Sequence, residues 1–143
     1  LFREFFKPRY AYLFSKWKTL NPNVKIAFHS DCNIYPIIPD LIEVGLDILN
    51  PIQPKSMDPA RVKKLYGEKL TFWGTVDIQE VLPFGTPEDV ANEVKLRIQT
   101  VGKGGGLIIS PAHNIQSQVP LENILAFYEA AKTFGRYPLK GNY

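Results

Sequence analysis

Four short apolar segments alternate with helical patterns along this chain, and this alternation limits its possible folds more than any other feature. Each segment is rich in β-branched or aromatic residues and is bounded by turn residues, which predicts a strand. The four segments span residues 24–28, 47–51, 70–74 and 106–110. Strands that are apolar on both faces and alternate with helices predict a parallel sheet covered by helices, of the α/β class.

Helical spacing of apolar residues recurs after each predicted strand. The predicted helices cover residues 34–44, 58–66, 86–101 and 121–134, and a leading helix covers residues 1–20. Asp58 and Thr86 have the positions of N-terminal caps, and a proline follows each of them in the first turn. Residues 81–85 are expected to form a loop. Because Leu1 is not a methionine and residues 2–17 already have a helical pattern, we expect the chain to begin inside a longer polypeptide.

Composition indicates one globular unit over residues 1–143. With 45% apolar and 22% charged residues, the chain can bury one core. The net charge of +3 comes from scattered residues without a Lys/Arg stripe, so we expect no nucleic-acid partner. No apolar run approaches the roughly 20 residues that cross a bilayer, so we expect no membrane partner. The single cysteine, Cys32, excludes an internal disulfide and fits a reducing compartment, so a cytoplasmic location is expected.

Periodicity alone leaves two architectures open for four βα units. They could form a small open, doubly wound sheet, or half of a (β/α)8 barrel, which needs on the order of 250 residues when complete. In both architectures ligands bind at the carboxyl ends of the strands, so the residues that follow each strand are the candidate site.

Polar side chains follow every predicted strand, and both histidines of the chain are among them. These residues are His29, Ser30, Asp31, Cys32, Asn50, Gln53, Thr75, Asp77, Gln79, Ser110, His113, Asn114 and Gln116. His113 lies in a polar loop, where a histidine is more readily explained by function than by burial. An imidazole there could transfer protons or bind a carboxylate.

Each of the other candidates also has a purely structural interpretation. His29 could be a buried imidazole bonded to a carbonyl group, and Asp31 could hold the turn after its strand. Asp77 is equally a turn former. His29, Asp31 and His113 together could supply three ligands to a catalytic zinc ion, although their spacing matches no recognised signature. Trp73 could form the wall of a pocket.

Seven short motifs, taken together and in order, resemble the uroporphyrinogen decarboxylase family. They are FHSDCNI at 28–34, DLIEVGLDILNP at 40–51, MDP at 57–59, FWGTVD at 72–77, TPEDV at 86–90, GGLIISPAHNI at 105–115 and PLENI at 120–124. The similarity runs from about Val24 to Phe134. It implies a (β/α)8 (TIM) barrel, of which this chain would be the last four βα units, a half barrel with parallel strands.

The resemblance also implies alternative functions for the full-length protein. Some members of the family decarboxylate porphyrinogens without a cofactor, and others move methyl groups between a corrinoid protein and a thiol or a pterin, some of them with zinc. Corrinoid-linked methyl transfer is the preferred interpretation, and decarboxylation of uroporphyrinogen in porphyrin biosynthesis is the alternative. A non-catalytic half barrel that dimerises is a third interpretation. The implied partners are a small-molecule substrate, a corrinoid protein, and a missing N-terminal half or a second copy.

The positions at the strand ends and the resemblance together give expected roles to individual residues. The expected catalytic residues are His113 and Asp31; the expected substrate-binding residues are His29, Asp77, Gln53 and Asn114; and the expected metal ligands are His29, Asp31 and His113. His113 matches a histidine that binds the porphyrinogen in the decarboxylases.

Several positions depart from the family's patterns. The zinc-dependent methyltransferases have cysteines where this chain has Asp31 and His113, so their thiolate ligand set is altered here. Cys32 occupies a position usually held by glycine, and Thr75 one usually held by glycine or asparagine. The groups that hold the substrate in the decarboxylases lie in the N-terminal half of the family's barrel. This fragment alone is therefore expected to be inactive.

Overall fold

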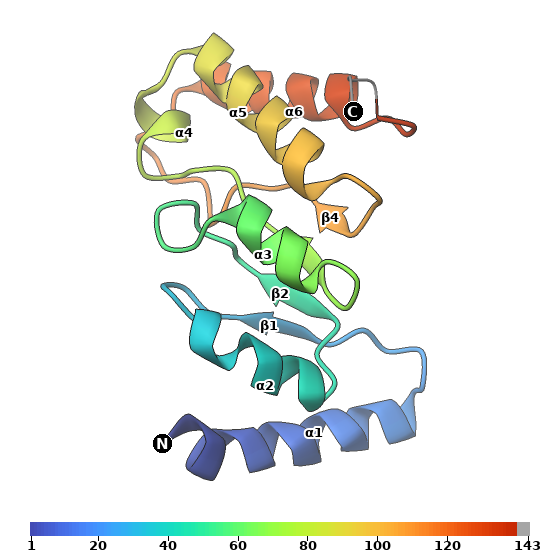
Figure 1. The fold of residues 1–143 in the computed structure, drawn as a ribbon. Coiled ribbons are helices and arrows are strands. Elements are labelled where there is room, and N and C mark those ends of the chain that lie inside the picture. The colour runs from blue at the N-terminus through green and yellow to red at the C-terminus, as the bar shows by residue number, and fades with distance from the viewer. Residues whose placement is uncertain (140–143) are drawn as a thin grey trace.

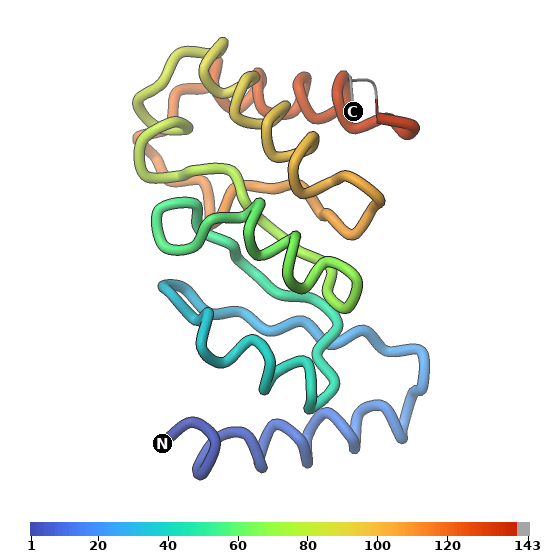
Figure 2. Tube along the Cα trace, viewed as in Figure 1, coloured from blue at the N-terminus to red at the C-terminus, as the bar shows by residue number. Residues whose placement is uncertain are grey.

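Four parallel strands form one sheet in the computed structural model, which describes residues 1–139. The strands are β1 (Ala27–His29), β2 (Ile48–Asn50), β3 (Thr71–Trp73) and β4 (Leu107–Ile108). Each strand pairs with the next one along the chain, in the order β1-β2-β3-β4. Figure 2 shows the same progression, with the N-terminal segment at one end and the C-terminal helix at the other. A doubly wound sheet needs a reversal of strand order, so the half-barrel fold predicted from the sequence is confirmed.

The strands are shorter than predicted, and directly before β1 a side chain supplies a hydrogen bond to the backbone. The Asp47 carboxylate accepts a hydrogen bond from the Ile26 backbone N–H at 2.9 Å and forms an ion pair with Lys18 at 3.0 Å. Burial acts to raise the pKa of Asp47, but the Ile26 N–H and the Lys18 ammonium outweigh it and hold that pKa below its ordinary value. Asp47 therefore joins the first two strands and the leading helix.

Helices follow every strand (Figure 1). Their bounds are η1 (Phe2–Phe6, a π-helix), α1 (Lys7–Leu20), η2 (Tyr35–Ile37, a 3-10 helix), α2 (Ile38–Glu43), α3 (Pro59–Tyr66), α4 (Val81–Phe84), α5 (Pro87–Val101) and α6 (Leu121–Phe134). Both predicted caps are confirmed. Asp58 accepts a hydrogen bond from the Ala60 N–H, and Thr86 forms a capping box with Asp89. The Thr86 contacts also hold the pKa of Asp89 below its ordinary value.

The prediction of a loop over residues 81–85 is wrong, because α4 occupies most of that segment. The Asp77 carboxylate accepts hydrogen bonds from the backbone N–H groups of Gln79, Glu80 and Val81, all at 3.1 Å. These bonds satisfy N–H groups that a short helix otherwise leaves free at its start. The acceptor lies four residues before the first residue of α4, farther than the usual N-cap position.

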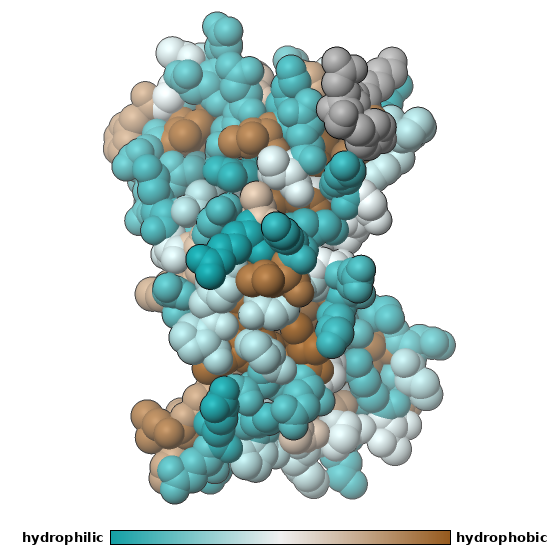
Figure 3. All heavy atoms as spheres, in the orientation of Figure 1, coloured by the Kyte–Doolittle hydropathy of each residue, from teal (hydrophilic) through white to brown (hydrophobic). Residues whose placement is uncertain are grey.

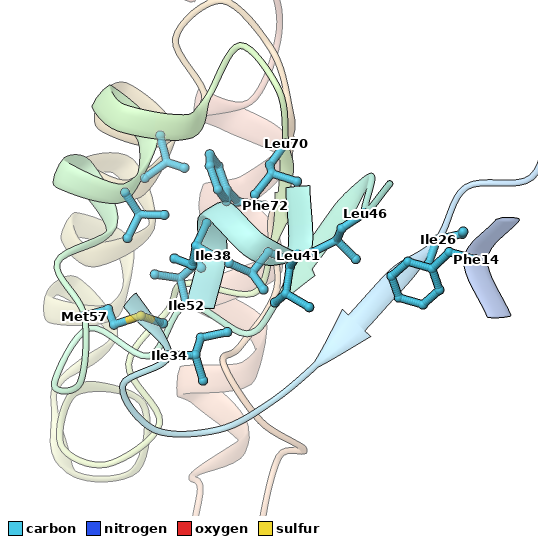
Figure 4. Close-up of a cluster of buried hydrophobic side chains, with 13 residues drawn as sticks. Phe14, Ile26, Ile34, Ile38, Leu41, Leu46, Ile52, Met57, Leu70 and Phe72 are labelled. Carbon is cyan, nitrogen blue, oxygen red and sulfur yellow. The ribbon is translucent and has the colours of Figure 1, made fainter. Parts of the chain in front are cut away.

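One face of the sheet packs against the helices. Alternate residues Leu49 and Phe72 are fully buried there, and Phe28 and Leu107 are half-buried beside them. Figure 4 shows the resulting core, in which Ile38 and Leu41 from α2 lie close to Ile52 and Phe72. The remaining members of this core are Phe14, Ile26, Ile34, Leu46, Met57, Val62, Leu70 and Val101.

A second core lies between α5, α6 and the segment after β3. Its buried residues are Val76, Leu82, Val90, Val94, Ile98, Phe127 and Ala130. Asn123 of α6 is also buried, and its amide donates hydrogen bonds to the carbonyl oxygens of Leu82 at 2.9 Å and Gly85 at 2.8 Å. These bonds fix the segment containing α4 against α6. The two cores together extend along the whole row of strands.

Glycine fulfils a backbone requirement at two turns. Gly45 has φ +98° directly after α2, which is the left-handed conformation that commonly ends a helix. Gly74 has φ +88° directly after β3, and a Cβ atom there would lie 3.1 Å from Cβ of Pro51. The conformation of Gly45 agrees with the predicted helix end at residue 45. The lack of a side chain at Gly74 allows the ends of β2 and β3 to approach closely.

An ion-pair network joins the leading helical segment to α2. Asp40 is buried, with 7% of its side chain exposed, and its carboxylate lies 2.8 Å from Nζ of Lys7 and 2.9 Å from Nε of Arg3. Lys7 also pairs with Glu43 at 2.7 Å. The Lys7 ammonium, followed by the Arg3 guanidinium, holds the pKa of Asp40 below its ordinary value of 3.8, and the pKa of Lys7 is raised by the same two carboxylates.

This network predicts a pH-dependent contribution to stability. The lowered pKa of Asp40 means that its contribution is fully present above the ordinary value of 3.8 and is lost as the pH falls through the folded-state pKa. We therefore expect Asp40→Asn to lower the urea midpoint by a constant amount above about pH 5 and by a shrinking amount below it. The exposed partner offers a control, because Glu43→Gln should have little effect at any pH. A deficit for Asp40→Asn that persists unchanged into strong acid would contradict this origin.

No helix within residues 1–139 is long and apolar enough to cross a membrane. The face seen in Figure 3 is mostly hydrophilic over the helices, and hydrophobic residues show between α2 and α3.

Candidate functional site

The face of the sheet opposite the helices carries the candidate site. The strand register pairs His29 with Asn50 and Trp73 with Ile108. His29, Trp73 and Ile108 are exposed and Asn50 is half-buried. Four adjacent strands therefore present one row of side chains on the uncovered face, near the carboxyl ends of the strands.

A groove of about 510 Å³ lies at these strand ends. Its lining residues are His29, Asn50, Trp73, Ser110, Pro111, Ala112, His113, Asn114 and Ile115. The groove therefore joins the end of β1 to the loop after β4 and receives both histidines of the chain. This juxtaposition is what parallel strands in sequential order produce, since all their carboxyl ends lie at the same edge.

His29 is held by a chain of hydrogen bonds across the strand ends. Its Nδ1 atom lies 2.6 Å from Oδ1 of Asn50, and the Asn50 amide nitrogen donates to the carbonyl oxygen of Trp73 at 2.9 Å. The His29 side chain remains 58% exposed, so it is not the buried imidazole that the sequence left open. Its second nitrogen, Nε2, lies 3.7 Å from Oδ2 of Asp31. A protonated imidazole would form an ion pair with this carboxylate.

Gln53 fixes the loop that carries Asp31. The Gln53 amide nitrogen donates to Oδ1 of Asp31 at 3.1 Å, and its carbonyl oxygen accepts from the backbone N–H of Cys32 at 3.0 Å. Cys32 has φ 71°, a left-handed conformation that favours glycine and costs a residue with a side chain about 1 kcal/mol or more. The predicted substrate-binding residue Gln53 therefore contacts Asp31 and lies outside the lining of the groove.

His113 and Asn114 lie on the opposite side of the groove from β1, in the loop after β4. Both side chains are exposed, in keeping with a position where they can meet a ligand. Within residues 1–139, no carboxylate pairs with His113 in the way that Asp31 pairs with His29. The two imidazoles thus have different surroundings although they share one groove.

Asp77 has the structural role that the sequence left open. Its side chain is buried, and both carboxylate oxygens accept hydrogen bonds from backbone N–H groups at the start of α4. It is absent from the lining of the groove. Asp77 shapes the turn after β3, and it offers no free carboxylate to a ligand in this arrangement.

The structure does not assemble the predicted zinc ligands. Over residues 1–139, no three His, Cys, Asp or Glu side chains lie close enough together to hold a metal ion. His29 and Asp31 are neighbours, but His113 does not join them as a third ligand. A catalytic zinc site needs about three protein ligands around one position, and residues 1–139 do not bring three of them together.

The segment directly after β3 is strained. Thr75 has φ 135°, and it is fully buried. Its hydroxyl oxygen has no hydrogen-bond partner among the described residues. Glycine or asparagine adopts positive φ more easily than threonine, which gives a physical reason for the residue types that the resemblance leads one to expect here. The strain lies beside Trp73, one wall of the groove.

Two residues that adjoin His29 in the groove were given no catalytic, substrate-binding or metal-binding role from the sequence, which placed Asn50 only among the polar residues at strand ends and Trp73 only as a possible pocket wall. Asn50 and Trp73 end neighbouring strands, and their position beside His29 depends on strand register. The sequence places Asn50 after its strand and Trp73 at a strand end, but it does not show which strand ends lie side by side. The sequential strand order, once known, places both residues beside His29.

Comparisons with known proteins agree with this geometry. The sequence profile of the family "Uroporphyrinogen decarboxylase (URO-D)" matches residues 1–134. Among solved structures, a methyltransferase from Methanosarcina mazei is similar with a TM-score of 0.73 and 25% sequence identity. The match covers 94% of this chain and 37% of that protein, so the chain spans well under half the length of this relative. A search of curated proteins gives no match.

The fold and the site define the class of the chain as four consecutive βα units of the (β/α)8 barrel, with a polar groove at the carboxyl ends of the strands. Because the profile match extends over nearly all of its residues, the chain belongs to the uroporphyrinogen decarboxylase family.

Proposed function

We propose that the full-length protein transfers a methyl group between a small-molecule donor and a corrinoid carried by a partner protein. The observation that carries this proposal is the chemical character of the groove. It combines two imidazoles, two side-chain amides and the ring of Trp73, and its lining contains no lysine or arginine. The similarity to a methyltransferase supports the same interpretation.

The part of the groove that this chain forms suits a methyl donor. Uroporphyrinogen is a polycarboxylate, and carboxylates are most strongly bound by arginine and lysine. The lining of the groove contains neither within residues 1–139, and the resemblance places the groups that hold a porphyrinogen in the N-terminal half of the barrel. Trp73, with 41% of its surface exposed, offers an apolar wall to a methyl-bearing group.

In such a reaction, residues of this chain would donate the proton that the demethylated donor atom takes up. When the bond from the methyl carbon to its donor atom breaks, the electron pair stays on the donor atom, which then takes up a proton. A protonated His29, stabilised by Asp31, can give that proton, and His113 lies in the same groove as a second candidate. A corrinoid, when bound, supplies the cobalt centre that accepts or releases the methyl group.

Decarboxylation of uroporphyrinogen is the second candidate function. The family match supports it, and so does the position of His113, which corresponds to a porphyrinogen-binding histidine in the resemblance described above. In that reaction the carbon–carbon bond to the carboxylate breaks, carbon dioxide leaves, and a proton replaces it on the carbon. His113 would then provide a hydrogen bond or a proton.

The uncovered face of the sheet needs a covering in either case. β1 and β4 are edge strands within the described residues, and Trp73 and Ile108 are 41% and 43% exposed. The expected covering is an N-terminal half of the same barrel, in line with the length of the methyltransferase that this chain matches only in part. A second copy of the chain would make it a dimerising half barrel instead.

An assay with two arms tests the proposal. The full-length protein is given reduced cobalamin with a methyl ether, a methylamine or a methyl thioether as donor, and methylcobalamin is followed by its absorbance. In the second arm uroporphyrinogen is added and released carbon dioxide is measured. We expect methylcobalamin with at least one donor class and no carbon dioxide above the blank. Carbon dioxide release without methylation would contradict methyl transfer and support the decarboxylase.

A further inference from the structure

The geometry points to Asn50 as a positioning residue that fixes the tautomer of His29. The side chain of Asn50 lies between two groups of neighbouring strands. Its Oδ1 atom is 2.6 Å from Nδ1 of His29, and its Nδ2 atom is 2.9 Å from the carbonyl oxygen of Trp73. Asn50 is the last residue of β2 and one of the polar residues at the strand ends, but the family resemblance gives it no role in the reaction.

The partner on β3 determines which way the Asn50 amide is turned. A backbone carbonyl oxygen only accepts hydrogen bonds, so the Trp73 carbonyl requires the NH₂ group of Asn50. The amide oxygen of Asn50 then faces His29. An amide oxygen also only accepts, so Nδ1 of His29 must carry the proton of the 2.6 Å hydrogen bond.

The tautomer decides which nitrogen of His29 is available for chemistry. In the neutral ring only one nitrogen is protonated, so a proton on Nδ1 leaves the lone pair on Nε2. Nε2 is the atom that lies 3.7 Å from Asp31, and Gln53 holds that carboxylate through its other oxygen. Asn50 thus keeps Nε2 free to accept a proton, and Asp31 stabilises the imidazolium that results.

Histidine bases in other proteins are commonly oriented in the same way, by a hydrogen bond to the ring nitrogen that does not take up the proton. The inference deepens the proposed function, since it concerns the residue that would hold the proton during methyl transfer. It does not depend on the identity of the donor. The tautomer can be measured without any turnover, so its failure is distinguishable from failure of the assay described above.

Two substitutions at Asn50 separate tautomer control from a structural role. Asn50→Asp keeps an oxygen acceptor toward His29 and loses the donor to Trp73. Asn50→Leu loses both. Both variants lose the hydrogen bond to the Trp73 carbonyl oxygen, and only Asn50→Asp, which also adds a negative charge, keeps an oxygen that can accept from His29.

The experiment is ¹⁵N NMR of the full-length protein labelled at histidine, recorded at an alkaline pH at which the ¹⁵N shifts themselves show a neutral ring. The His29 signals are assigned by their loss in His29→Gln. We expect Nδ1 protonated and Nε2 unprotonated in the wild type and in Asn50→Asp. In Asn50→Leu we expect loss of that tautomer as the dominant form, while the His113 signals stay unchanged in both variants.

Two results would overturn the inference. The first is a wild-type spectrum in which Nε2 carries the proton, and this result decides even if neither variant folds. The second is the wild-type His29 tautomer as the dominant form in Asn50→Leu, which would show that Asn50 does not determine the tautomer.

Discussion

Replacing His29 with asparagine is expected to lower kcat/KM for methyl transfer by about 10²- to 10⁴-fold, the usual effect of losing a general acid or base. The substitution is selective, because an asparagine amide can still donate to Asn50 near the position of Nδ1 while nothing replaces Nε2. The loss therefore measures the nitrogen that faces Asp31 and the groove. The loss in kcat/KM is measured from methylation rates with reduced cobalamin and the donor class that proves active.

A matched amide substitution outside the groove provides the control for His29→Asn. Gln99 lies on the exposed side of α5, and Gln99→Asn is expected to leave kcat/KM unchanged. An unaltered urea midpoint of the His29→Asn protein would show that the loss is chemical. Full activity of His29→Asn would remove His29 from the reaction.

The largest effect on stability is expected at Phe72, the central side chain of the first core. Phe72 is fully buried on β3, between the sheet and the helices that cover it. Phe72→Ala is expected to lower the free energy of unfolding by about 3–5 kcal/mol, because apolar burial is lost and a cavity remains. Lys63, whose Nζ lies 6.0 Å from the centre of the Phe72 ring, would also lose that contact. Urea denaturation of the full-length protein measures the difference.

Leu65 supplies the comparison for Phe72. It belongs to α3 but is 54% exposed, so Leu65→Ala is expected to change stability by no more than about 0.5 kcal/mol. Similar losses for Phe72→Ala and Leu65→Ala would mean that the buried face of the sheet has been assigned incorrectly.

The fold could be predicted from local signals because those signals are strong here. Asp58 and Thr86 have the side chains that cap helices, and Gly45 has the residue type that ends them, so those boundaries were predicted within a residue or two. The helix α4 could not be predicted this way. Its start depends on Asp77, whose carboxylate reaches forward across a turn to three backbone N–H groups.

The candidate site could be predicted only at the level of strand ends. Alternation of strands and helices predicts that His29 and His113 lie at one edge, and the groove contains both. Their partners depend on register and loop geometry, which the sequence does not specify. This is why Asn50 was not assigned a role, why Gln53 contacts Asp31 from outside the groove, and why the three expected zinc ligands do not come together.

The claim that His29 and His113 act in one site is tested most directly by a double-mutant cycle on kcat/KM for methyl transfer, with His29→Asn, His113→Asn and the double variant. Residues that act on one substrate in one groove give strongly non-additive losses. We therefore predict that the double variant loses far less activity than the product of the two single losses. A double loss equal to that product would show that the two imidazoles act independently and would contradict the claim that they act together in one site.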